Sequence, residues 1–133
     1  MMEVMDRLSG YDKRPIVLAV TALTSFNEDE FQSVYESPIA KKADQFAIDA
    51  SESGLDGVVC SAYESESIKN ITNKNFMTLT PGIRPFGEDA GDQQRVADIA
   101  FAKNASVDFI VVGRPIYKSE NPAEVVKKIL EKI

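Results

Sequence analysis

The chain has 133 residues, which suits one domain with a real hydrophobic core, and its net charge of −6 without a basic stripe argues against a nucleic-acid partner. No apolar run approaches the roughly 20 residues of a membrane span, and the first residues lack a signal-peptide pattern, so with only one cysteine the sequence favours the cytoplasm. The chain has no histidine, which removes the commonest general base and metal ligand and every Ser-His-Asp arrangement.

Strand and helix signals alternate along the chain. Continuous apolar, partly β-branched runs are typical of strands covered on both faces, and they predict four strands, at 15–21, 55–60, 76–80 and 109–112. Apolar residues at helical spacing, together with capping residues, predict six helices, at 1–8, 28–34, 38–53, 64–70 and 92–103 and from Pro122 onward.

This alternation predicts an α/β fold with four parallel βα units after an N-terminal helix, in one region over 1–133. Four such units make half of an eight-stranded TIM (β/α)₈ barrel, which takes about 250 residues in full. An α/β domain usually begins with a strand, so the initial helix favours a chain that begins inside a longer design. A small open sheet with an additional helix is the alternative.

Two loops combine glycine with arginine directly after the third and fourth predicted strands. Gly82 and Arg84 lie in the first loop, and Gly113 and Arg114 lie in the second, 114 − 84 = 30 residues further on between the arginines. Glycine lets a backbone N–H approach an anion, and arginine adds a planar fork of donors. The loops therefore indicate a phosphate site, although each arginine could instead be a surface residue paired with a nearby carboxylate.

Other polar residues fall near the same predicted strand ends. Gln93 is expected in the first turn of the helix at 92–103, where free N–H groups favour an anion, unless it is simply an exposed glutamine. Thr24 follows the first strand and could bond the edge of a planar ligand or cap the turn. Cys60 reads as a buried small apolar group, and Glu64 and Glu66 read as solvated helix positions.

Several segments together resemble the C-terminal part of the orotidine 5′-phosphate decarboxylase family. The resemblance covers essentially the whole chain in order. It is carried by Leu18-Ala19-Val20-Thr21-x-Leu23-Thr24-Ser25, Gly54-Leu55-Asp56-Gly57-Val58-Val59-Cys60-Ser61, Leu79-Thr80-Pro81-Gly82-Ile83-Arg84-Pro85, Gly91-Asp92-Gln93-x-Arg95 and Val111-Val112-Gly113-Arg114-Pro115.

The resemblance implies strands five to eight of a (β/α)₈ barrel from an enzyme, usually a homodimer, that converts orotidine 5′-monophosphate to uridine 5′-monophosphate and CO₂ without metal or cofactor. By the same resemblance Thr24 would read the pyrimidine edge and Pro81 would line the base pocket. The phosphate-side contacts would be Arg84, Gln93, Gly113 and Arg114.

The family's catalytic motif, Asp-x-Lys-x-x-Asp, occurs nowhere in this sequence. We therefore expect no catalytic residue in this chain and no activity from it alone. Open strand edges invite pairing with another chain, so we also expect self-association or pairing with a missing N-terminal half. The alternative is a non-catalytic phosphate-binding or self-assembling fragment.

Overall fold

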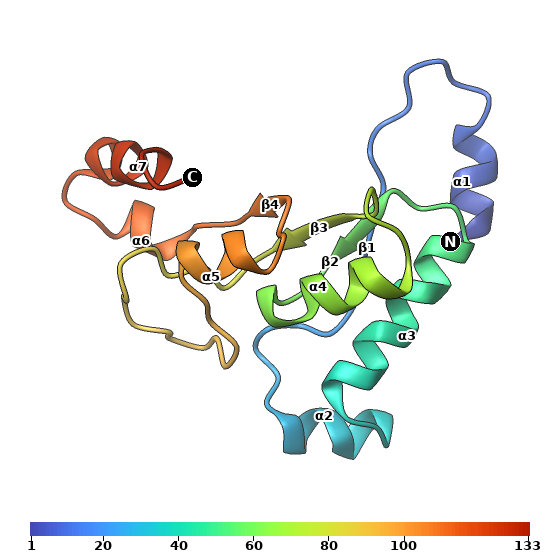
Figure 1. Cartoon of the computed structure of the whole chain (residues 1–133), viewed down its shortest axis with the longest axis horizontal. Coiled ribbons are helices and arrows are strands. Elements are labelled where there is room, and N and C mark those ends of the chain that lie inside the picture. The colour runs from blue at the N-terminus through green and yellow to red at the C-terminus, as the bar shows by residue number, and fades with distance from the viewer.

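The computed structural model describes residues 1–133 and contains seven helices and four strands. In chain order they are α1 (Met2–Leu8), β1 (Leu18–Val20), α2 (Glu28–Tyr35), α3 (Ile39–Glu52), β2 (Gly57–Val59), α4 (Ala62–Ile71), β3 (Met77–Thr80), α5 (Ile99–Asn104), β4 (Phe109–Ile110), α6 (Arg114–Tyr117) and α7 (Pro122–Leu130). The molecule is open and elongated, with α1 and α7 toward opposite ends (Figure 1). None of the helices is long and apolar enough to cross a membrane.

The four strands form one parallel sheet in the order β1-β2-β3-β4. The register sets Val20 beside Val59, Val59 beside Leu79, and Leu79 beside Phe109. Consecutive parallel strands joined by helical connections are the repeating βα units of a barrel, and β1 and β4 remain the open edges. The predicted α/β fold of four parallel units is confirmed.

Helices α3, α4 and α5 lie along the same side of this sheet (Figure 1). Side chains alternate between the two faces of a strand, so Val58 points toward the helices and its neighbours in the strand point away. Two buried clusters fill the space under the helices. The first contains Ala47, Ala50, Leu55, Val58, Cys60, Ile68 and Phe76, and the second contains Ala62, Ile83, Ala97, Ile99, Ala102 and Ile129.

The opposite face of the sheet is apolar and incompletely covered. Val20 on β1 is 56% exposed, and Phe109 on β4 is 49% exposed in the same register row. Val111, two residues beyond Phe109, is 42% exposed. In a closed barrel this face would point into the packed interior, so the four units leave part of an apolar core open to solvent.

Two carboxylates fasten the N-terminal ends of the strands. Asp56 precedes β2 and accepts a hydrogen bond from the Val17 N–H at 2.7 Å, and Arg14 bonds both oxygens of this carboxylate. Asp108 precedes β4 and accepts from the Thr78 N–H at 2.8 Å and from Lys69 Nζ at 2.7 Å. Each carboxylate accepts a hydrogen bond from a backbone N–H of the strand segment before its own, so it holds the N-terminal ends of two neighbouring strands together.

The predicted helix at 92–103 was wrong in its first turns, because α5 begins only at Ile99. The Asp98 side chain accepts a hydrogen bond from the Phe101 N–H at 2.7 Å and caps the helix there. Ala97 instead forms a parallel bridge with Ile83. Gln93 therefore lies in a loop and not at a helix N-terminus. The structure also contains α6, a short helix that was not predicted.

Candidate functional site

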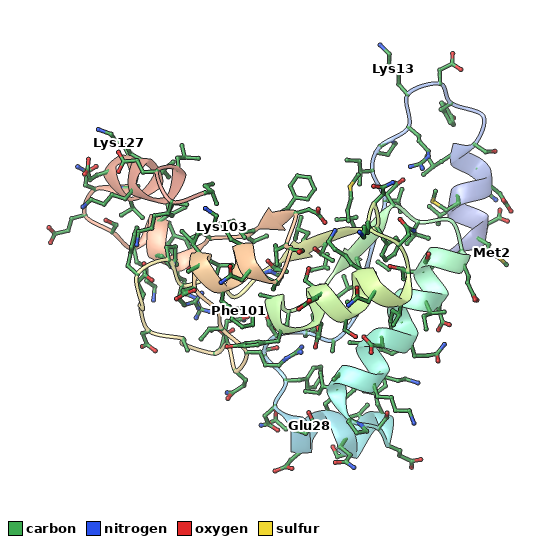
Figure 2. The ribbon with its side chains drawn as sticks, in the orientation of Figure 1. Met2, Lys13, Glu28, Phe101, Lys103 and Lys127 are labelled. Carbon is green, nitrogen blue, oxygen red and sulfur yellow. The ribbon has the colours of Figure 1, made fainter.

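The loops that follow β1, β3 and β4 leave the same edge of the sheet, because parallel strands all end there. The loop after β3 is the longest and runs from residue 81 to the start of α5 at Ile99. It contains four of the residues singled out in the sequence, namely Pro81, Gly82, Arg84 and Gln93. The side-chain view in Figure 2 places Lys127 on α7 at the far end of the molecule from Lys13, with Phe101 on α5 between them.

Arg114 is the first residue of α6 and lies against the loop after β3. Its guanidinium pairs with the Asp92 carboxylate, and this hydrogen bond holds the pKa of Asp92 below its ordinary value. Gly91 lies under the guanidinium, since a Cβ at this position would lie 3.0 Å from Arg114 Cζ. The Arg114 guanidinium thus lies directly against the Gly91 backbone, and a side chain at Gly91 would displace it.

A cavity of about 270 Å³ opens beside Arg114, and its walls combine both signs of charge. Arg114 and Lys118 supply the cations, and Glu88 and Asp89 supply the anions. The full lining is Glu88, Asp89, Gly91, Arg114, Pro115, Lys118 and Ser119. Lys118 was not singled out from the sequence. It directly follows α6, a helix that was not predicted, so the sequence contained no signal for it.

Arg84 is buried, and its guanidinium holds the loop after β3 in shape. Nε donates to the Asp89 carbonyl at 2.8 Å, Nη2 donates to the Ala90 carbonyl at 2.7 Å, and Nη1 donates to the Ile83 carbonyl at 3.1 Å. Three of the five donors of a guanidinium are therefore used within the loop. Arg84 is not the carboxylate-paired surface residue that the sequence left open as an alternative.

Thr24 and Gln93 are 69 residues apart in the chain, and their side chains are in contact. The Thr24 hydroxyl donates to the Gln93 side-chain oxygen, and the Thr24 carbonyl accepts from the N–H groups of Gln94 at 3.0 Å and Arg95 at 3.2 Å. Gly82 packs into the same corner, where a Cβ would lie 3.5 Å from Gln93 Oε1 and 3.8 Å from Thr24 Cβ. Thr24 joins two loops and caps no helix.

Glu64 corrects a prediction, because it is buried and not a solvated helix position. Its carboxylate pairs with Arg95 and also accepts from the Ser61 N–H at 2.9 Å. Burial raises the pKa of Glu64, and the positive charge of Arg95 opposes that rise. Sequence reasoning missed this pair, since the two residues are 31 positions apart and no local pattern relates them.

The remaining candidates differ in exposure. Pro81 is half-buried and directly precedes Gly82, and Gly113 is exposed immediately before α6. Cys60 is buried as expected, and desolvation raises the pKa of its thiol to about 12, which keeps it protonated and unreactive near neutral pH. No group of three or more acidic, cysteine or histidine residues is arranged to hold a metal ion.

Four parallel βα units, with glycine and arginine in the loops after the last two strands, define an α/β protein of the barrel class. The chain belongs to the orotidine 5′-phosphate decarboxylase / HUMPS family, whose model matches residues 1–129.

Individual relatives agree with this assignment. An orotidine 5′-phosphate decarboxylase of Sulfurimonas denitrificans is 80% identical over all 133 residues, which cover 59% of that relative. The enzyme of the same name from Nautilia profundicola is 67% identical over 98% of the chain and 56% of its own length. The crystal structure of orotidine 5′-phosphate decarboxylase from Lactobacillus acidophilus superposes with a TM-score of 0.72 at 33% identity, over 89% of this chain and 49% of that one. The chain therefore spans about half the length of the curated relatives that it matches, from 47% to 59%.

Proposed function

We propose that this chain carries the nucleotide-binding portion of an orotidine 5′-phosphate decarboxylase, a cytoplasmic enzyme of pyrimidine nucleotide synthesis. The observation that carries the proposal is the short segment from Gly91 to Gln93. Its first residue supports the Arg114 guanidinium, and its last residue contacts Thr24 from the loop after β1. One loop thus connects the cavity beside Arg114 to the Thr24 hydroxyl, which follows a different strand.

In this proposal the substrate phosphate binds at Arg114 and the Gly113 backbone. Pairing with Asp92 keeps the guanidinium in place until a dianion competes for it. Gln93 adds an amide donor, and Arg84 shapes the loop while two of its N–H groups stay available.

The pyrimidine end of the substrate is assigned to Thr24 and Pro81. A threonine hydroxyl both donates and accepts a hydrogen bond, which suits the polar edge of a pyrimidine. Proline gives a rigid apolar wall beside it. Binding energy from the remote phosphate can then hold the reacting ring in a site that favours loss of CO₂.

Turnover requires a proton donor at the ring, and in the family this donor belongs to the Asp-x-Lys-x-x-Asp motif that this sequence lacks. We therefore propose that this chain binds the nucleotide and does not decarboxylate it unaided. The region over 1–133 would act as a single C-terminal half-barrel that needs an N-terminal half to complete the active site.

Isothermal titration with uridine 5′-monophosphate tests the binding proposal. We expect Arg114→Ala to weaken binding at least about tenfold, since a hydrogen bond from a charged group is worth about 1.5–3 kcal/mol. Arg7→Ala removes an exposed arginine of α1 and is the matched control. An Arg114→Ala variant that binds as tightly as the wild type would rule out the phosphate site.

The catalytic proposal is tested by following the ultraviolet band of orotidine 5′-monophosphate. We expect no loss of the band with this chain alone, and loss when an N-terminal half from the Sulfurimonas denitrificans relative is added. Turnover by the 133-residue chain alone would overturn the claim that the essential lysine lies elsewhere.

A further inference from the structure

A single guanidinium joins three separate segments at the candidate site. Arg95 pairs with Glu64 in the first turn of α4. Its Nη2 also donates to the carbonyl oxygens of Ala22 at 3.0 Å and Leu23 at 3.2 Å, in the loop after β1. Arg95 itself lies in the loop after β3, so its side chain fastens that loop both to α4 and to the loop after β1.

The ion pair is buried and held from both sides. Glu64 is 5% exposed, and the Arg95 side chain is 16% exposed. The second carboxylate oxygen of Glu64 accepts the Ser61 N–H, which completes a capping box on α4 and leaves the carboxylate little freedom to rotate. The planar fork of arginine can bond the carboxylate and the carbonyls together, whereas a lysine ammonium offers no such fixed geometry.

The position of Arg95 determines where Gln93 can lie. The N–H groups of Gln94 and Arg95 both donate to the Thr24 carbonyl, so the backbone beside Gln93 is fixed against the loop after β1. The hydroxyl of Thr24 then reaches the side chain of Gln93. If Arg95 were released, its side-chain bonds to Ala22 and Leu23 would be lost. Besides the contact itself, the two backbone hydrogen bonds to the Thr24 carbonyl would then be the remaining bonds between this segment and the loop after β1, because Val96 and Ala97 are bonded to other parts of the chain.

We propose that Arg95, held by Glu64, is a positioning residue that keeps Thr24 and Gln93 in contact, so that the pyrimidine end and the phosphate end of the site act together. This inference rests on the proposed function. Neither Arg95 nor Glu64 is assigned a contact with the nucleotide.

The test is a double-mutant cycle on binding of uridine 5′-monophosphate to the 133-residue chain. Dissociation constants are measured by calorimetry for Thr24→Val, Gln93→Met and the two together. We expect the combined loss in the wild-type background to differ from the product of the single losses by about fivefold, because residues in direct contact couple. We call this ratio the coupling factor, and we expect it to fall below about twofold in an Arg95→Met background.

Further variants separate positioning from folding. Arg95→Met leaves the Glu64 carboxylate buried without its ion-pair partner, and a buried unpaired charge can unfold a domain. The double variant Glu64→Gln/Arg95→Met removes both charges, and we expect it to fold and to show the same loss of coupling. Arg95→Lys keeps the charge without the planar fork, and it should recover only part of the coupling. Lys103→Met removes an exposed cation of α5 and should leave the coupling intact.

A merely structural role for Arg95 would weaken binding without changing the coupling factor. A factor that stays at its wild-type value in both Arg95→Met and Glu64→Gln/Arg95→Met would overturn the inference. If the wild type binds the nucleotide but the effects of Thr24→Val and Gln93→Met are additive, this inference is overturned and the proposed function is not. A wild type that does not bind the nucleotide would overturn the proposed function and this inference with it.

Discussion

At the residue scale, Gly91 determines where the Arg114 guanidinium lies. Its φ is +65°, and an added Cβ would collide with the guanidinium of Arg114. We expect Gly91→Ala to move Arg114 away and to lower the affinity for inorganic phosphate by about tenfold, the loss of one charge-assisted hydrogen bond. The left-handed backbone adds a stability loss of about 1–2 kcal/mol. Calorimetry with phosphate and urea unfolding measure the two effects.

Gly87 provides a matched control for that substitution. Its φ is +80°, and no atom lies within 4 Å of an added Cβ. Gly87→Ala should therefore carry the same backbone cost and leave phosphate affinity near the wild-type value. Equal losses of affinity in the two variants would mean that strain in the loop, and not displacement of Arg114, controls binding.

Asp56 makes stability depend on pH. The hydrogen bonds from Arg14, at 2.6 and 2.7 Å, lower the pKa of Asp56 below its ordinary value. A carboxyl with a lowered folded-state pKa stabilises the fold above its unfolded-state pKa, about 3.9, and that contribution is lost as the pH falls through the lowered folded-state value. We expect the urea midpoint to decrease from about pH 5 downward, and to decrease less steeply in Asp56→Asn.

Asp12 is the control for this titration, since it lies exposed in the loop before β1 and forms no ion pair. Asp12→Asn should keep the wild-type dependence on pH. If Asp56→Asn also kept it, the pair between Arg14 and Asp56 would not be a source of acid sensitivity.

At the scale of elements, the contact between β2 and β3 depends on a missing side chain. Gly57 pairs with Met77, and a Cβ on Gly57 would lie 2.7 Å from the carbonyl carbon and the Cβ of Met77. Because backbone atoms of a central strand cannot move aside, we expect Gly57→Ala to destabilise the fold by about 3 kcal/mol or more, at the upper end of overpacking costs.

Urea unfolding measures that cost, and Gly10→Ala provides the comparison. Gly10 has open space around it, and its φ is not in the left-handed region. We expect the free energy of unfolding of Gly10→Ala to stay within about 0.5 kcal/mol of the wild type. A similarly small effect at Gly57 would show that β2 and β3 can separate locally without loss of the fold.

The sequence predicted elements better where a local pattern decided them than where a distant partner did. The apolar runs located all four strands, because a strand covered by helices must be apolar along its length. The helix predicted from residue 92 failed because Ala97 pairs with Ile83 and Asp98 is the stronger cap. A helical spacing of apolar residues could not reveal that Ile83, 14 residues earlier in the loop after β3, would pair with Ala97.

The candidate site divides in the same way. Glycine and arginine are neighbours in the chain at Gly113 and Arg114, so the sequence alone could single out this loop, and its role as an anion site stays a prediction. The burial of Glu64 was not predictable, since its partner Arg95 lies in another loop and reaches it only after three segments come together. The hydrogen bonds of Arg84 to carbonyls of its own loop were likewise invisible without the loop's conformation.

At the scale of the whole molecule, the uncovered sheet face and the two open edges favour association. Val20, Phe109 and Val111 expose apolar surface beside strands whose outer backbone groups have no partner strand. We expect sedimentation to give a mass above the 14.6 kDa of one chain. Phe109→Lys, which places a charge on the open face and edge, should shift the protein toward the monomer. Leu130→Lys on α7 is an equally simple apolar-to-charged change, and it should not.

We expect a partner that covers the open face and edges more completely to replace the second copy of this chain in the homo-oligomer. A partner that offers a strand to β1 and another to β4 would pair with both open edges and cover the apolar face of the sheet. We therefore expect the part of the Sulfurimonas denitrificans relative that this chain does not match to dissociate the homo-oligomer and form a one-to-one complex, as sedimentation would show. A homo-oligomer that persists beside an excess of that part, or a monodisperse monomer without it, would contradict the view that the open face drives association.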